Sequence, residues 1–239
     1  MSFDTGNRFA ARTAIPQVGI DAGLRSYMLR VYNYMAGGLA ITGVVAYAAA
    51  ASGLYAALVH TPILFWIVVF APLGLVLLLS FRIQKMSLGA AQATFWGYAG
   101  LVGLSLAGLF LIYTGASIAE VFFITAATFL AMSLWGYTTK KDLTGFGHFL
   151  IMGLIGVIIA SLVNLFLHSP GMYFAISVIG VLVFTGLTAY DTQRIKEMYW
   201  EGDGEVVAGK KAIMGALALY LDFINLFIML MQLMGQRRN

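Results

Sequence analysis

Charged residues divide this chain into long apolar segments. No Asp, Glu, Lys or Arg occurs from Val31 to Phe81 or from Leu143 to Tyr190. A membrane-spanning helix needs about 20 apolar residues, so each segment is long enough for two spans, separated by the turns at 60–62 and 168–171. The pattern predicts seven spans, at roughly residues 33–55, 63–81, 91–113, 118–138, 148–167, 171–191 and 212–234, with a charged loop at residues 192–211.

The composition agrees with a chain that lives in a bilayer. Hydrophobic residues make up 61% of it and charged residues only 10%, against about 25% charged in soluble domains. Its mean hydropathy is +0.88. Lipid accepts apolar side chains, provided that helices satisfy the backbone internally. We therefore expect an all-α membrane protein, a seven-helix bundle that is surrounded by lipid.

Basic residues indicate the orientation of the bundle. Twelve of the fourteen Lys and Arg residues fall on one side of the predicted spans, and only Arg237 and Arg238 fall on the other. Basic residues concentrate in cytoplasmic loops. We expect a polar cytoplasmic segment at residues 1–30, a membrane domain at residues 31–236 and a short tail at residues 237–239. A re-entrant last segment, which would return the tail to the cytoplasm, stays an alternative.

Three acids lie within or beside predicted spans, where a charge is costly and a functional role is the first hypothesis. Glu120 sits near a span end and can reach water. Asp191 ends the sixth predicted span, close to Arg194, and Asp222 lies near the middle of the seventh. Asp222 belongs to a stripe of small and polar residues at helical spacing, which we expect to face the interior or a wet cavity: Lys211, Gly215, Ala218, Asp222, Asn225, Met229 and Gln232.

Spacing alone does not bring Asp191 to Asp222. The loop charges place Asp191 shallower by roughly 10 Å at the helical rise. The two carboxylates can meet only if the seventh helix starts well before Lys211 or if a cavity opens from the cytoplasm. If they meet, they cannot both ionise cheaply and would share a proton. When both are ionised they supply oxygen ligands for a hard cation such as calcium.

Other chemistry finds little support in the sequence. The chain has no cysteine, which excludes disulfides and a cysteine nucleophile. His60, His148 and His168 lie near span ends, without the spacing of a metal site. Ser105 resembles a nucleophile elbow only loosely. We expect no enzyme, no tightly bound cofactor and no nucleic-acid partner.

Small residues recur every four positions on two predicted spans, which indicates close helix packing within the bundle. One row comprises Ala99, Gly103 and Ala107, and the other comprises Gly156 and Ala160.

Four segments resemble the Bax inhibitor family, the transmembrane Bax inhibitor motif proteins, which include bacterial YccA-like members. The two most specific are residues 185–196 (TGLTAYDTQRIK) and 219–227 (LYLDFINLF), which carry Asp191 and Asp222. Residues 123–129 (FITAATF) and 136–143 (GYTTKKDL) also resemble family segments. The likeness covers nearly all of the chain after about residue 25.

The resemblance implies seven helices with the last one central, and an aspartate dyad near the cytoplasmic side. It implies a pH-sensitive calcium leak, with protons and calcium as permeant or weakly bound ions, and a bacterial inner membrane as the location. Asp191 and Asp222 match the pH-sensing, cation-binding pair of the family. Arg82, at the end of the second predicted span, matches an arginine that takes part in closing the family's channel, and we call it the latch. Candidate pore-lining residues are Asn225, Gln232 and Glu120.

A second function from a different class stays open at this point. YccA-like members resemble regulators of a membrane protease of the FtsH type, or of a stress response, which act without transport. The polar N-terminal segment would then be the contact with the protease.

Overall fold

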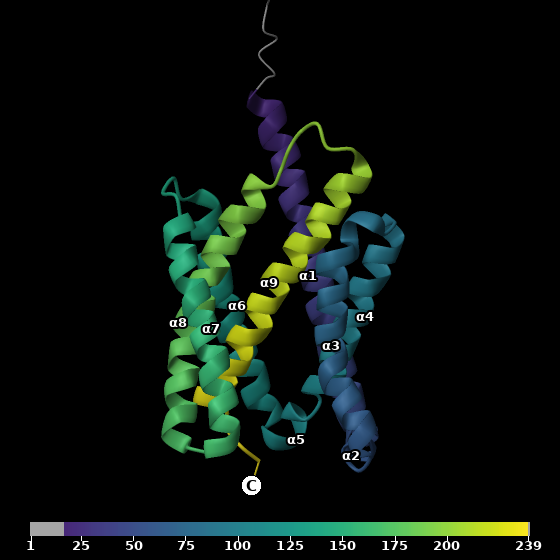
Figure 1. Ribbon diagram of the computed structural model, residues 1–239, viewed down its shortest axis with the longest axis vertical. Coiled ribbons are helices and arrows are strands. Elements are labelled where there is room, and N and C mark those ends of the chain that lie inside the picture. Colours follow the sequence, from purple (N-terminus) through teal and green to yellow (C-terminus); the bar gives the residue numbers. More distant parts are fainter. Residues whose placement is uncertain (1–16, 239) are drawn as a thin grey trace, which may run out of the picture.

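The computed structural model describes residues 17–238 and consists of a bundle of long helices (Figure 1). Seven helices in this part of the chain are long and apolar enough to cross a membrane. The predicted all-α membrane architecture is therefore confirmed. The first 16 residues of the predicted N-terminal segment, and Asn239, lie outside the described residues.

The seven long helices alternate in direction along the chain. They are α1 (Gln17–Ala51), α3 (Pro62–Arg82), α4 (Leu88–Leu106), α6 (Gly115–Thr138), α7 (Thr144–Leu167), α8 (Pro170–Glu197) and α9 (Glu205–Met234). Short turns of helix, α2 (Leu54–Val59), α5 (Leu109–Ile112) and the 3-10 turn Ile83–Lys85, lie between them.

Local sequence explains where several of these helices begin. Ser87, Thr114 and Ser169 precede α4, α6 and α8, and each side chain accepts a hydrogen bond from a backbone N–H in the first turn. Such caps satisfy donors that have no partner within the helix. Proline starts α3 and α8, a position where its missing N–H costs nothing.

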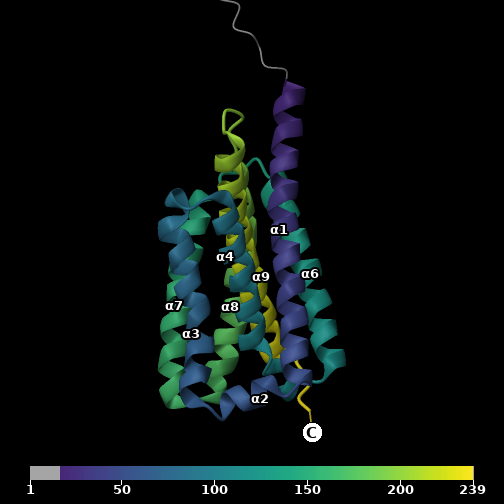
Figure 2. The ribbon, with the colours of Figure 1, turned by 90° about the vertical axis from the view of Figure 1, so that its right-hand side faces the viewer.

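Helix α9 is the most buried of the seven. In its apolar 18-residue stretch 61% is buried, against 6% in the corresponding stretch of α3 and 17% in that of α7. It packs mainly against α8, α1, α6 and α4, and Figure 2 shows α3 and α7 on one side of the molecule with α1 and α6 on the other. Enclosure of the last helix by all six others stays a prediction.

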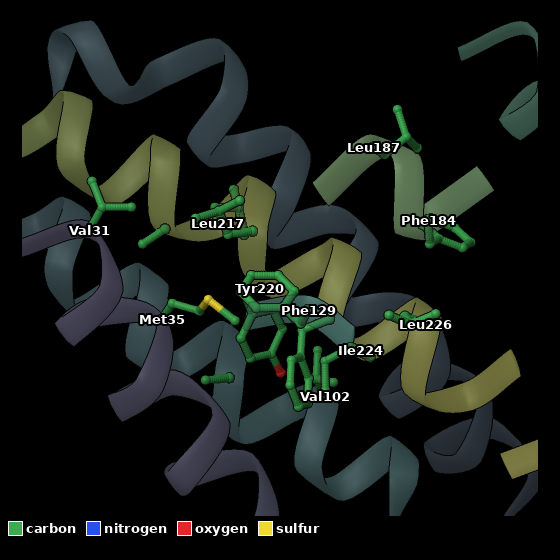
Figure 3. Packing of buried hydrophobic residues seen from close by; sticks show 14 of the residues in the cluster. Val31, Met35, Val102, Phe129, Phe184, Leu187, Leu217, Tyr220, Ile224 and Leu226 are labelled. Atoms are coloured by element: carbon green, nitrogen blue, oxygen red, sulfur yellow. The ribbon is translucent and has the colours of Figure 1, made fainter. Parts of the chain in front are cut away.

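Aromatic residues of α9 and α4 form the middle of the core. Tyr220 is fully buried and lies edge-on to Phe95 and Tyr98, close to Met35 and Val102 (Figure 3). Its hydroxyl is hydrogen-bonded to Thr42 Oγ1 at 2.6 Å. In hydrocarbon an unpartnered hydroxyl would be costly, so this bond helps to fix α9 against α1.

The two rows of small residues differ in their role. Gly103 lies where a Cβ would come within 2.6 Å of the Thr42 carbonyl oxygen, so α1 and α4 approach closely, as predicted. Gly156 is exposed and a Cβ there would meet nothing within 4 Å. The predicted packing role of Gly156 is wrong, because this face of α7 turns away from the bundle.

The helix ends nearest the two aspartates also differ from the prediction. Helix α8 continues through Glu197, six residues beyond Asp191, and α9 begins at Glu205, before Lys211. The predicted charged loop at residues 192–211 is therefore mostly helix. Charged side chains at a membrane surface are compatible with helix, since long basic side chains reach water from the last turns.

The last helix does not turn back within the bundle. Helix α9 is continuous over 30 residues, about 45 Å at the helical rise, and the C-terminal end lies opposite the start of α1 (Figure 1). The tail is held there by backbone hydrogen bonds from Thr114 N to Gln236 O and from Arg238 N to Ile112 O. This course agrees with seven full spans rather than a re-entrant segment.

Gln193 joins α8 to the connection between α6 and α7, and we expect its removal to destabilise the bundle. Its Oε1 accepts from Leu143 N and its Nε2 donates to Lys141 O, both at 2.8 Å. In Gln193→Ala both backbone groups lose their partners, at a cost of about 1–3 kcal/mol each where water cannot replace them. A thermal melt in detergent should show a clear decrease in Tm. Glu197→Ala, an exposed change on the same helix, is the control and should leave the Tm unchanged; equal Tm values for both variants would contradict the role of Gln193.

Candidate functional site

Helices α8 and α9 bring the two aspartates of the sequence motifs together. The carboxyl groups of Asp191 and Asp222 lie within hydrogen-bonding reach of each other. Of the two conditions set by the sequence, the early start of α9 is met, since this helix begins 17 residues before Asp222. Because α8 also continues past Asp191, both acids lie within helices rather than at a helix end.

The pair is withdrawn from water, and more so at Asp222. The Asp222 residue is 4% exposed, and the Asp191 side chain is 17% exposed. Asp222 Oδ2 is buried without a hydrogen-bond partner among the described residues. Two ionised carboxylates can only accept hydrogen bonds, so their contact is a hydrogen bond only when one carries a proton.

Arg194 is the base closest to the pair. Its Nη1 lies 4.0 Å from Asp191 Oδ1, and its side chain is 63% exposed. An ion pair this long and this exposed contributes little stability. The guanidinium can therefore move away from Asp191 at low cost, whereas Asp222 forms no salt bridge with any described residue.

Arg82, the predicted latch, is not brought to the pair. It ends α3, its side chain is exposed, and it forms no salt bridge with a described residue. Arg194, which the sequence places close to Asp191, is the base that forms this contact. A latch function for Arg82 stays a prediction, and it would require α3 to approach α8.

The two aspartates open into a cavity of about 830 Å³ that reaches from α3 to α7. We call it the dyad cavity. Most of its lining is apolar, and its other polar residues include Tyr98, Ser161, Arg194 and Asn225. Helices α3 and α7 do not pack closely against each other. This side of α9 is therefore open between them. A carboxylate pair inside a mainly apolar cavity is costly, so a functional role is the first hypothesis for it.

The polar stripe of α9 faces cavities, as the sequence predicts. Ala218, Asp222, Asn225 and Met229 line the dyad cavity. Met229 and Gln232 line a second cavity of about 630 Å³ near the C-terminal end. The Asn225 Nδ2 donates to Leu221 O at 2.8 Å, which leaves its amide oxygen as an acceptor. The Gln232 Oε1 accepts from Ser177 Oγ at 2.7 Å.

Glu120 does not belong to this arrangement. It is exposed on α6 and lines neither cavity. The suggestion that Glu120 lines a pore is not supported, because its position near the start of α6 lets it reach water directly.

Tyr98 is a cavity residue that the sequence did not indicate. It lies on α4, is 3% exposed, and lines the dyad cavity opposite α9. A tyrosine in a membrane span has no distinctive pattern, since aromatic residues are common in spans and at their ends. Only the packing of α4 against α9 shows that it shares a cavity with Asp222.

The oxygen atoms at this site are too few to enclose a calcium ion. Calcium takes six to eight oxygen ligands, and two carboxylates with one amide oxygen supply fewer. Within residues 17–238 no group of three or more His, Cys, Asp or Glu side chains could hold a metal.

Side-chain contacts join the loop between α8 and α9 to both of these helices. Asp203 forms a salt bridge with Lys211, and the Asp203 side chain is only 10% exposed. Lys211 Nζ also donates to the Met198 carbonyl at 3.0 Å. These contacts fix the start of α9 to the end of α8, and so help to set the register in which Asp191 meets Asp222.

Comparison with known proteins gives one consistent result. A family model described as "Inhibitor of apoptosis-promoting Bax1" matches residues 24–239. The Escherichia coli inner membrane protein YbhL is 50% identical over 220 residues, which cover 91% of this chain and 94% of YbhL. A Rickettsia prowazekii protein is 53% identical over 92% of this chain and 93% of its own length. A Streptococcus pyogenes membrane protein is 37% identical over 90% of this chain and 95% of its own length.

Proposed function

This chain belongs to the Bax inhibitor family of integral membrane proteins, and we propose that it is a calcium leak whose conductance depends on the protonation of Asp191 and Asp222. In this proposal calcium is the permeant ion, no enzymatic activity is involved, and no cofactor is bound tightly. We place the protein in a bacterial inner membrane, since its relative YbhL is named an inner membrane protein, with its N-terminus in the cytoplasm.

One observation carries the proposal: a buried carboxyl group, Asp222, has an oxygen without a hydrogen-bond partner among the described residues and meets a second carboxyl group in a cavity. A stability role would favour full pairing, because an unsatisfied buried polar atom costs about 1–3 kcal/mol. A proton or a cation would satisfy the Asp222 oxygen. In this proposal, the proton that controls the leak and the calcium ion that passes through it would each satisfy this buried oxygen.

Protonation would change the site in a defined way. With both carboxyl groups ionised, the pair carries two negative charges and attracts a divalent cation. With one proton shared, one charge is neutralised and the carboxyl groups bond to each other instead. Arg194, at 4.0 Å and largely exposed, can neutralise Asp191 in the ionised state without blocking Asp222.

Flux of ions through the purified protein tests the proposal. Liposomes that carry the protein and a trapped calcium indicator should take up calcium faster than protein-free liposomes, with a rate that changes between pH 5 and pH 8. Potassium uptake measured in parallel should be slower, because a site with two carboxylates favours a divalent ion. A soluble marker dye that stays trapped inside shows that the liposomes are intact.

An absence of calcium uptake above protein-free liposomes at every pH, with protein shown to be folded and inserted, would overturn the leak. The protease-regulating function, with the N-terminal segment as contact, would then become the leading proposal. Deletion of residues 1–16 separates the two, since it should weaken binding to a membrane protease and leave calcium flux unchanged.

A further inference from the structure

The dyad cavity adjoins a second cavity toward the C-terminal end of the bundle. The second cavity, which we call the tail cavity, lies where α7 ends and α8 begins. Its lining is notably polar and includes Asn164, His168, Ser169, Tyr173, Gln232 and Arg237. Three residues line both cavities: Ser161, Leu165 and Met229. These three form the boundary between the two spaces.

The boundary presents little polarity to an ion. Leu165 is apolar, and the Ser161 hydroxyl donates its hydrogen to the Val157 carbonyl at 2.7 Å. Met229 is the only contribution of α9, the helix that carries both Asp222 and Gln232. Seven residues separate Met229 from Asp222, about 10 Å along the helix. A cation that moves from the aspartates to the tail cavity along α9 therefore passes Met229.

The structure also provides a place that holds the Met229 side chain. A Cβ on Gly180 of α8 would lie 2.9 Å from both Cγ and Sδ of Met229, so the methionine lies directly against the glycine backbone. Methionine has three rotatable side-chain bonds and adapts to irregular spaces. Rotation about these bonds can move the Met229 side chain away from Gly180.

We propose that Met229 is an apolar gate, which separates the dyad cavity from the tail cavity when it lies against Gly180 and joins them when it rotates away. Narrow apolar constrictions block ions because water does not fill them. The inference rests on the proposed leak for its physiological meaning, but the barrier itself can be tested without any measurement of flux.

Cysteine labelling provides this test, because the chain has no cysteine of its own. Asn225→Cys reports on the dyad cavity and Gln232→Cys on the tail cavity. Glu201→Cys, in the exposed loop between α8 and α9, and Gln236→Cys, exposed beyond α9, show from which side of the membrane a reagent acts. A membrane-impermeant thiol reagent is applied from the side that labels Gln236→Cys and not Glu201→Cys.

We expect the reagent to label Gln232→Cys readily and Asn225→Cys at least about tenfold more slowly, which corresponds to a barrier of about 1.4 kcal/mol. Adding Met229→Ala to Asn225→Cys should remove most of this difference, whereas Met229→Leu should keep it. Ile228→Ala is the matched control, since Ile228 is the neighbour of Met229 on α9 and lines neither cavity.

Unchanged labelling of Gln232→Cys with Met229→Ala shows that the bundle is still folded. If Met229→Ala does not insert, Met229→Ser removes the same apolar bulk and should have the same effect. Rapid labelling of Asn225→Cys while Met229 is present, or slow labelling after its removal in a folded bundle, would overturn the gate. A failed leak would instead appear as absent calcium flux with the labelling pattern intact.

Discussion

Replacement of Asp222 by asparagine is expected to reduce the calcium flux of the reconstituted protein at least about tenfold at every pH from 5 to 8. A tenfold change corresponds to about 1.4 kcal/mol, a small share of what a carboxylate contributes to a divalent cation in a cavity with little water. Asparagine has nearly the same shape, so the packing of this 4% exposed residue should survive. The loss would report on charge rather than on folding.

Glu120→Gln provides the matched control for this change. It also removes one carboxylate from a membrane-spanning helix, but Glu120 is exposed on α6 and lies outside both cavities. We expect its flux to equal that of the parent protein. Equal flux in Asp222→Asn and the parent would show that calcium does not use this site, and equal losses in both variants would indicate a general effect of charge.

Gly136→Ala is expected to have the largest effect on stability. A Cβ at Gly136 of α6 would run into the backbone carbonyl of Ala189 and lie 2.8 Å from its Cα. Backbone cannot rotate out of the way, so α6 and α8 must separate, at a cost of about 1–3 kcal/mol or more. Because Ala189 lies two residues before Asp191, the change should also displace the aspartate pair. Thermal unfolding in detergent should show a Tm several degrees lower, together with reduced calcium flux.

Gly156→Ala is the control for the helical preference of alanine. Gly156 lies on α7, where a Cβ would meet nothing within 4 Å, so the substitution only removes the flexibility of glycine, which favours the helix by about 1 kcal/mol. The Tm should stay the same or rise. If Gly136→Ala were as stable as Gly156→Ala, α6 and α8 would not be in the close contact described above.

The fold could be predicted because its determinants are local. Apolar length and charge position identified seven spans, and the turns at 60–62 and 168–171 separated the uncharged segments. The helix ends were less accurate. Charged residues after Asp191 were interpreted as loop, yet Arg194 and Lys196 continue α8, since basic side chains can reach water from a helix.

The site could be predicted only in part, because contacts between helices leave little trace in a single sequence. The stripe on α9 identified Asp222, Asn225, Met229 and Gln232 as residues that face a cavity. Spacing alone did not predict that Asp191 meets Asp222. The resemblance to the family did predict it. That Arg82 forms no salt bridge with a described residue, and that Tyr98 lines the dyad cavity, depend on how α3 and α4 pack.

The most direct test of the aspartate pair as a single titrating unit is the pH dependence of calcium flux, measured from pH 5 to pH 8 on the parent protein, Asp191→Asn and Asp222→Asn in the same liposomes. A shared proton requires both carboxyl groups. We therefore predict that each variant alone loses the pH dependence of the parent, in addition to any loss of rate. A variant that keeps the pH dependence of the parent would show that its aspartate has no part in the response, and would contradict a protonation-controlled pair.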